Sequence, residues 1–183
     1  MSHTLKFLSS LLLLAAVNVH ATVIEYTLDD LGGGSWQYNY TVTNDLPVVP
    51  LNEFTIYFEL GLYENLSVVT SPAGWDDMLV QPGSFMGLND GYYDSFLFAG
   101  LAAGESAGIF SVSFDWLGVG SLPDEQFFEV VDPNTFALLD DGMTTLAPPV
   151  PLPGAALLFL NGIGLLAGMA HFRRRATITA ANV

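Results

Sequence analysis

Apolar and polar side chains alternate with a period of two along three segments in the middle of this chain. A β-strand points successive side chains to opposite faces of its sheet, so this pattern predicts half-buried strands. The three segments are residues 36–42, 54–60 and 110–116. No part of the middle keeps a helical period of 3.6 over three turns, which argues against an amphipathic helix there.

Shorter candidate strands fill the remainder of the middle, at spacings of about ten residues. They are residues 23–28, 66–70, 78–80, 95–98, 127–131, 136–139 and 144–146. Turn signals separate them, namely Gly32-Gly33-Gly34, Asn89-Asp90-Gly91 and Asp141-Gly142, because glycine adopts the positive φ that tight turns need. We therefore predict one all-β domain over residues 22–147, an antiparallel β-sandwich of immunoglobulin-like or jelly-roll type.

Charge is distributed very unevenly along the chain. All 19 acidic residues lie between Thr22 and Ala147, whereas the four basic residues and three histidines lie outside, so this range has a formal charge of −19. The chain has no cysteine. Ser-His-Asp triads, lysine Schiff bases, histidine zinc sites and thiolate nucleophiles are therefore excluded from the domain. We predict no catalytic residues, no enzymatic activity and no nucleic-acid binding, since the domain has no cation to displace phosphate counterions.

Calcium is the cofactor that such acidic residues would suit, because it prefers hard oxygen ligands and extracellular sites need only weak affinity. Asn89, Asp90 and Asp94, around Gly91, are the best local candidates, although they lack the spacing of an EF-hand. Three adjacent acidic pairs are expected in solvated turns. These are Asp29-Asp30, Asp76-Asp77 and Asp140-Asp141.

Aromatic residues outside the strand pattern are candidates for stacking on sugars. Trp75, Tyr92 and Tyr93 form the one such group that we select, whereas aromatics at strand period, such as Tyr38 and Tyr40, are expected in the core. Two alternatives to a structural role follow. One is a carbohydrate-binding module, with or without Ca²⁺, and the other is a small glycan hydrolase built on two carboxyl groups.

The N-terminus has the pattern of a secretory signal peptide, residues 1–21. Lys6 precedes an apolar run from Phe7 to Val17, and Val19 and Ala21 suit the −3 and −1 pockets of signal peptidase. Cleavage is therefore expected between Ala21 and Thr22, with export of the rest of the chain.

The C-terminal part has the pattern of a membrane-spanning helix over residues 154–172. A helix of this length extends roughly 28 Å, close to the thickness of the hydrocarbon layer. Arg173, Arg174 and Arg175 follow directly, and the positive-inside rule holds such a cluster in the cytoplasm. The acidic domain would then face outward, in agreement with the N-terminal signal.

A proline-rich stretch, residues 148–153, joins the domain to this helix. Proline fixes φ and lacks an N–H, so the stretch should be an extended spacer that a processing enzyme can reach. It ends in the motif Val150, Pro151, Leu152, Pro153 and Gly154. This motif, followed by the helix and the arginines, resembles a PEP-CTERM sorting signal of the VPLPA variant, over residues 148–175.

This resemblance implies a protein of a Gram-negative bacterium that makes exopolysaccharide. In the family, a membrane-embedded exosortase recognises the tail and processes it, so the inner-membrane anchor would be transient and the protein would reach the cell surface or the extracellular matrix. The sequence departs from the family in two places: Gly154 replaces the usual alanine, and a short tail, residues 176–183, follows the arginines. An ordinary single-span anchor is the alternative interpretation.

Overall fold

A computed structural model describes residues 21–149 of the chain, which form ten β-strands. In chain order these are β1 (Val23–Gly32), β2 (Ser35–Thr43), β3 (Leu51–Phe58), β4 (Tyr63–Thr70), β5 (Trp75–Val80), β6 (Gly91–Leu101), β7 (Ser106–Trp116), β8 (Phe127–Val131), β9 (Leu138–Met143) and β10 (Thr145–Leu146). Every segment with strand pattern in the sequence contributes to one of them.

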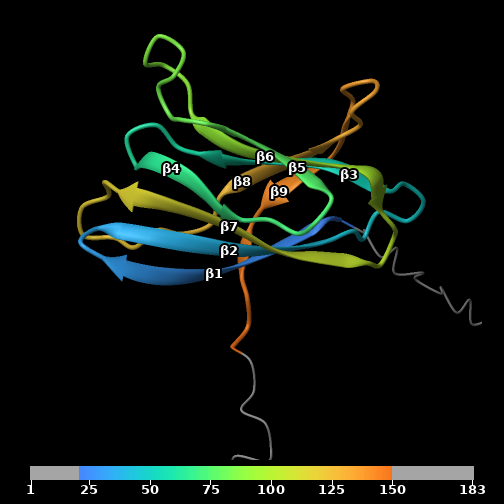
Figure 1. The fold of residues 1–183 in the computed structure, drawn as a ribbon, viewed down its shortest axis with the longest axis horizontal. Helices are drawn as coiled ribbons and strands as arrows, with labels where there is room; N and C mark the ends of the chain where they lie inside the picture. The colour runs from blue at the N-terminus through green and yellow to red at the C-terminus, as the bar shows by residue number, and fades with distance from the viewer. Residues whose placement is uncertain (1–20, 150–183) are drawn as a thin grey trace, which may run out of the picture. The chain divides into compact units, whose positions relative to one another are not determined.

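The strands form two five-stranded sheets that pack face to face as a sandwich (Figure 1). Sheet A has the order β10-β1-β2-β7-β4, and sheet B has the order β5-β6-β3-β8-β9. The predicted all-β sandwich is thus confirmed. One detail of the prediction is wrong: β10 pairs with β1 in parallel, through Glu25–Thr145 and Tyr26–Leu146, whereas all other pairings between the strands are antiparallel.

Aromatic rings fill much of the space between the sheets. Tyr38 and Tyr40 of β2 are fully buried, as their strand-period spacing predicts. The Tyr38 ring stacks on Phe114 of β7, with centroids 4.9 Å apart, and meets Tyr26 of β1 edge-on at 5.2 Å. Such pairs add about 0.5–1.5 kcal/mol each to the burial of the rings. This core stabilises the domain without disulfides.

The turn signals are correct at Gly32-Gly33-Gly34 but not at Gly91, nor at Asp141-Gly142, which lies within β9. Gly33 and Gly34 have φ of 69° and 92° and connect β1 to β2 in a hairpin, as predicted. Gly91 instead begins β6 without a positive φ, and a Cβ there would lie 2.5 Å from Cδ of Pro82. Glycine is needed at position 91 because the backbone of another segment comes so close.

The acidic pairs lie in strands, which corrects the prediction of solvated turns. Asp29-Asp30 belong to β1, Asp76-Asp77 to β5 and Asp140-Asp141 to β9. Adjacent residues of a strand face opposite sides of its sheet. Asp76 is accordingly exposed, whereas Asp77 is half-buried and accepts hydrogen bonds from core residues.

Several predicted segments lie outside the described residues. They are residues 1–20 of the expected signal peptide, the motif from Val150 to Gly154, the helix over 154–172, the arginine cluster and the tail. Within 21–149, no helix has both the length and the hydropathy to cross a bilayer. By its contacts the chain divides into two units, residues 1–147 and 148–183, and the sandwich belongs to the first.

Candidate functional site

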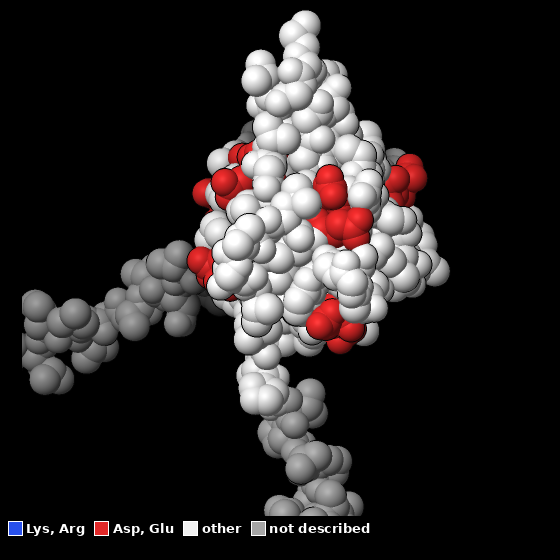
Figure 2. Space-filling view, turned by 90° about the vertical axis from the view of Figure 1, so that its left-hand side faces the viewer, with Lys and Arg blue, Asp and Glu red and all other residues white. Residues whose placement is uncertain are grey.

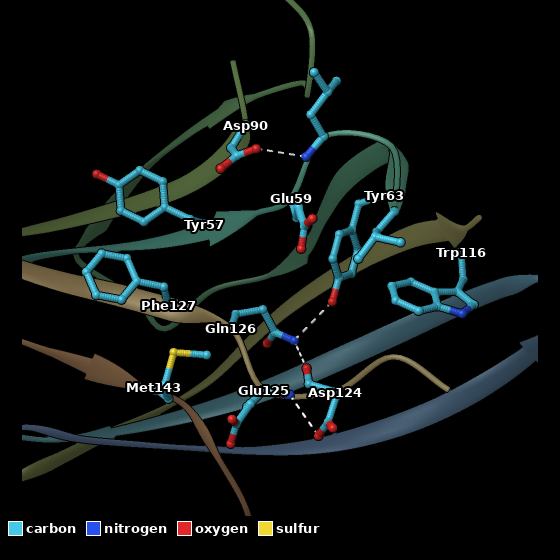
Figure 3. Close-up of a pocket in the computed structure, with 12 residues that line it drawn as sticks. Tyr57, Glu59, Tyr63, Asp90, Trp116, Asp124, Glu125, Gln126, Phe127 and Met143 are labelled. Atoms are coloured by element: carbon cyan, nitrogen blue, oxygen red, sulfur yellow. Dashed lines mark hydrogen bonds between the residues drawn. The ribbon is translucent and has the colours of Figure 1, made fainter. Parts of the chain in front are cut away.

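A cavity of about 540 Å³ opens at the end of the sandwich where β7 terminates (Figure 3). Aromatic side chains from four strands line it. They are Tyr57 near the end of β3, Tyr63 at the start of β4, Trp116 at the end of β7 and Phe127 at the start of β8. Strands from both sheets end or begin here, so the two sheets bring together rings that are far apart in the sequence.

The buried amide of Gln126, 3% exposed, forms the polar floor of this cavity. Its Oε1 accepts a hydrogen bond of 2.9 Å from the Tyr40 hydroxyl, and its Nε2 donates to the hydroxyls of Tyr38 and Tyr63. The Gln126 backbone N–H donates to Oγ1 of Thr144, at 2.9 Å. Because these partners hold the amide on several sides, the floor is rigid.

Four carboxylates surround the opening, from Glu59, Asp90, Asp124 and Glu125. Asp90 accepts a hydrogen bond of 2.8 Å from the backbone N–H of Leu60. Asp124 accepts one of 2.9 Å from the N–H of Glu125. Figure 2, which faces the end of the sandwich drawn at the left of Figure 1, shows Asp and Glu patches and no Lys or Arg among the described residues.

The tyrosines near this opening are held in their neutral form. Burial, followed by the charge of Asp124 and the hydrogen bond to it, raises the pKa of Tyr26 to about 12. Burial and the hydrogen bond to Glu129 raise the pKa of Tyr57 well above its usual value. At physiological pH both hydroxyls are therefore hydrogen-bond donors to carboxylates.

Three rings form a row across the outer face of sheet B, and this row adjoins the cavity. We call Tyr92 of β6, Tyr57 of β3 and Phe127 of β8 the aromatic row. Centroids of Tyr57 lie 6.3 Å from Tyr92 and 5.8 Å from Phe127. Val80 of β5 pairs with Tyr92, and Met143 of β9 pairs with Phe127, so the row continues to both edge strands. The three rings span about 10 Å, and the line from Val80 to Met143 crosses all five strands over about 19 Å.

A second row runs parallel to the aromatic row, two residues further along the strands. It consists of Asp94 of β6, Thr55 of β3, Glu129 of β8 and Asp141 of β9, all joined by strand register. We call it the acidic row, and two residues of strand separate it from the rings by about 7 Å. Thr55 donates a 2.7 Å hydrogen bond to Asp94, and the Tyr57 hydroxyl donates one of 2.7 Å to Glu129.

Carboxyl groups on this face repel one another. Burial raises the pKa of Asp94, and burial together with the neighbouring Asp94 raises the pKa of Glu53. Glu53 lies on β3, opposite Phe96 of β6. A shared proton or an external cation would relieve this repulsion.

The predicted glycan-contact residues do not form one surface. Tyr93 is fully buried, and Trp75 is half-buried with its ring edge-on to Phe54 and Phe110, at 5.7 and 5.0 Å. Both residues therefore serve the core. Tyr92 alone lies on the outer face of sheet B, where it belongs to the aromatic row.

The predicted calcium ligands also lie apart. Asn89 and Asp90 are in the β5–β6 loop, where the Asn89 side chain accepts from the N–H of Phe85 at 2.7 Å and donates to the Asp90 backbone. Asp94 is four residues further along an extended strand, about 13 Å away. No group of three or more acidic or histidine side chains in residues 21–149 converges as metal ligands do.

Of the residues predicted for export and sorting, Ala21 and Thr22 are within the described range. Thr22 is 4% exposed, and its backbone nitrogen donates a hydrogen bond to the Asp140 carboxylate. The other predicted residues lie outside the described range, namely Val19, the motif Val150 to Gly154 and the arginines Arg173 to Arg175.

Sequence reasoning missed Tyr57, Phe127 and Gln126. The alternation of Tyr57 with buried Ile56 and Phe58 signals an outward side chain, but the pairing of β3 with β8 is not visible in the sequence. No known protein-family model matches this chain, and no curated protein matches it in sequence. The site therefore has to be interpreted from its own chemistry.

Proposed function

We propose that this chain is an exported, non-enzymatic surface protein that associates with extracellular polysaccharide through the aromatic row and the adjoining cavity. The aromatic row is the observation that carries this proposal. Aromatic rings on a sheet face stack on the apolar faces of sugar rings, and they do so with little conformational entropy cost because few of their bonds rotate.

The exposure of the aromatic row supports its proposed role in stacking on sugar rings. Phe127 is 39% exposed and Met143 is 45% exposed, while Tyr57 and Tyr92 are half-buried on the outer face. Val80 and Met143 extend the row to the two edge strands of sheet B, so a polymer can lie across all five strands. A short saccharide end or branch would fit the cavity beside it, where the carboxylates offer hydrogen-bond acceptors.

Delivery to the surface is the second part of the proposal, and the sequence at both ends supports it. Signal peptidase would remove residues 1–21, and the PEP-CTERM-like tail would hold the protein in the inner membrane until an exosortase-type enzyme acts near Pro153. The intact mass of the protein from surface and medium fractions tests this step. A mass for residues 22 to about 153 is expected, and a form that keeps Arg173 to Arg175 would mean a permanent anchor.

The jelly-roll form of the sandwich is also part of the proposal. The pairs β2–β7 and β3–β6 are nested around the connection from β4 to β5, and nesting of this kind is typical of a jelly roll. Jelly rolls are common in lectin domains, which agrees with a role in glycan association.

Affinity electrophoresis in gels that contain the host exopolysaccharide tests the glycan association. Tyr57→Ala should weaken retardation by about tenfold, because a lost ring contact is worth roughly 1–2 kcal/mol. Phe136→Ala is the matched control, since this ring is 80% exposed in the β8–β9 loop, away from the row. Equal retardation of the wild type and Tyr57→Ala would contradict the proposal. Release of reducing sugar ends would indicate the alternative, a carboxylate-based hydrolase.

A further inference from the structure

The ligand class at the outer face of sheet B follows from charge. This face carries Asp94, Glu129 and Asp141 in register beside the rings, and Glu53 next to them. Residues 22–147 contain no Lys, Arg or His, so no cation of the domain neutralises these groups. An acidic polysaccharide would meet only like charges here.

The arrangement of the carboxylates distinguishes a single bound metal ion from cationic groups repeated along a polymer. They are spaced at strand intervals along a line and do not converge on one point, which disfavours a single divalent ion and favours cationic groups repeated along a polymer. The line is parallel to the aromatic row and about 7 Å from it. A sugar stacked on a ring would therefore hold its substituents near a carboxylate.

Two loops flank the same face. The β5–β6 loop and the β8–β9 loop both rise on the outer side of sheet B, at opposite ends of its strands (Figure 1). A polymer that crosses the strands would run between them, along the aromatic row.

We propose that the polysaccharide bound on this face carries free amino groups, as a partly deacetylated hexosamine polymer does. This inference rests on the proposed glycan association and names its substrate class. Stacking on Tyr92, Tyr57 and Phe127 positions the sugar rings, and the ammonium groups pair with the acidic row by charge-assisted hydrogen bonds.

Binding of the exported protein to three polymers tests the inference. These are a glucosamine polymer, its N-acetylated form and a polyuronate. The glucosamine polymer should bind about tenfold more tightly than the acetylated one, with strong salt dependence, and the polyuronate should bind least. The double variant Glu129→Gln, Asp141→Asn should lose that preference while its rings remain. Gln at position 129 keeps an acceptor for the Tyr57 hydroxyl.

Two controls separate this site from general attraction to polycations. Glu64→Gln removes one charge from an exposed position of sheet A and should leave the preference intact. Tyr57→Ala should weaken binding to the glucosamine polymer but not to polylysine. If Tyr57→Ala leaves binding to the glucosamine polymer and to polylysine unchanged, charge alone explains the binding and the inference is overturned.

The outcomes also separate this inference from the function on which it rests. Equal binding of the amino and acetylated polymers, sensitive to Tyr57→Ala, would overturn the amino-sugar assignment and leave glycan association standing. Absence of binding to any glycan, the host polysaccharide included, would overturn both.

A different observation concerns the start of the domain. Thr22 precedes β1 of sheet A, and its buried backbone nitrogen bonds to Asp140 in β9 of sheet B. Among the buried side-chain nitrogen and oxygen atoms of the described residues, the Thr22 hydroxyl is the one that lacks a hydrogen-bond partner. One residue therefore connects the two sheets at this edge.

Removal of the signal peptide would change the chemistry of that nitrogen. Hydrolysis of the bond between Ala21 and Thr22 places the hydroxyl of water on the Ala21 carbonyl carbon and a proton on the Thr22 nitrogen. The resulting amine has an ordinary pKa near 8 and is protonated at neutral pH. We infer that this new ammonium pairs with Asp140 and so completes the junction between the sheets on export, an inference that rests on the proposed cleavage.

The composition makes this ammonium easy to observe. Lys6 is the one lysine of the chain, and it leaves with residues 1–21, so the exported form has a single primary amine. An acylating reagent should modify it at least about tenfold more slowly in the native protein than in urea, because in the native protein the amine is paired with Asp140. Asp140→Asn should remove the protection, whereas Asp141→Asn, at the exposed neighbouring position, should keep it.

Stability gives a second measurement. Acetylation of the amine in urea, followed by refolding, should lower the unfolding midpoint by about 5 °C. Native reactivity equal to that in urea, or identical behaviour of Asp140→Asn and Asp141→Asn, would overturn the inference. An intact mass that begins elsewhere than Thr22 would overturn the proposed cleavage with it, while glycan binding would be unaffected.

Discussion

The hydroxyl of Tyr93 donates a hydrogen bond of 2.7 Å to Oδ1 of Asp77, an inward-facing carboxylate of edge strand β5. The Ser95 hydroxyl donates to the same oxygen, also at 2.7 Å. Both donors are fully buried, so the carboxylate satisfies two hydroxyls that water cannot reach. Burial and this hydrogen bond also hold the pKa of Tyr93 well above its usual value.

Asp77→Ala should therefore destabilise the domain by about 2–3 kcal/mol, because two buried donors lose their acceptor. Urea unfolding followed by circular dichroism measures this change. Asp76→Ala is the control, since its exposed side chain faces outward and should cost less than about 0.5 kcal/mol. Equal effects of the two substitutions would contradict the assigned role of Asp77.

Gln126→Leu should cost about 3 kcal/mol in the free energy of unfolding. The substitution keeps the side-chain volume roughly constant but leaves the Tyr40 and Tyr63 hydroxyls without their amide partner. A double-mutant cycle with Tyr40→Phe should show a coupling of about 1 kcal/mol. Additive effects of Gln126→Leu and Tyr40→Phe would mean that the two side chains do not interact.

Alkaline conditions should unfold the protein as its tyrosines ionise. Burial raises the pKa of Tyr26 to about 12 and that of Tyr38 far above the usual range, whereas tyrosine in an unfolded chain ionises near 10. The native state thus binds these protons more tightly, so stability is complete below about pH 10 and decreases as the pH rises toward 12. Tyrosinate absorbance and loss of circular dichroism should rise together. Ionisation of all seven tyrosines near pH 10 with the fold intact would be inconsistent with their burial.

Glu53→Gln should stabilise the domain slightly at pH 7. The raised pKa of Glu53 means that the fold favours its protonated form, so the charged form costs stability at neutral pH. This cost disappears as the pH falls through the raised pKa toward the ordinary 4.5. We expect a rise in the unfolding midpoint of about 2 °C at pH 7, limited by solvent screening, and none at pH 4.

Glu64→Gln controls for the general repulsion in a domain of charge −19. Its side chain is exposed at the start of β4, so it should gain less than Glu53→Gln. Identical gains from the two substitutions would show that overall charge, and not the contact of Glu53 with Asp94, determines the effect.

The period-two pattern was sufficient to predict the strands but not their partners. Alternation along β2, β3 and β7 follows from burial of one face, which each sequence segment displays by itself. The site depends instead on register between segments, because Tyr57 and Phe127 are 70 residues apart and meet only through the β3–β8 pairing. Local sequence contains no information about that pairing.

Local turn signals failed where tertiary contacts decide the backbone. Asp141-Gly142 has the composition of a tight turn, yet both residues lie within β9. The Phe128 ring lies 3.2 Å from the position of a Cβ on Gly142, so the glycine there makes room for a neighbouring strand. The same reason applies to Gly91 beside Pro82. Trp75 looks like a surface residue in the sequence because its short edge strand β5 shows little alternation. Tyr93 looks like one because it follows Tyr92 directly, and two adjacent tyrosines do not reveal which of them faces inward.

Strand β10 determines how a mechanical load on the C-terminal side would enter the sandwich. It has only two residues, and beyond it the N–H of Ala147 donates to the Tyr26 carbonyl at 2.8 Å. A pull on the chain after Ala147 would break these few bonds first and leave β1 paired with β2. The strand would thus detach first under tension and lengthen the chain on that side before the aromatic core is strained.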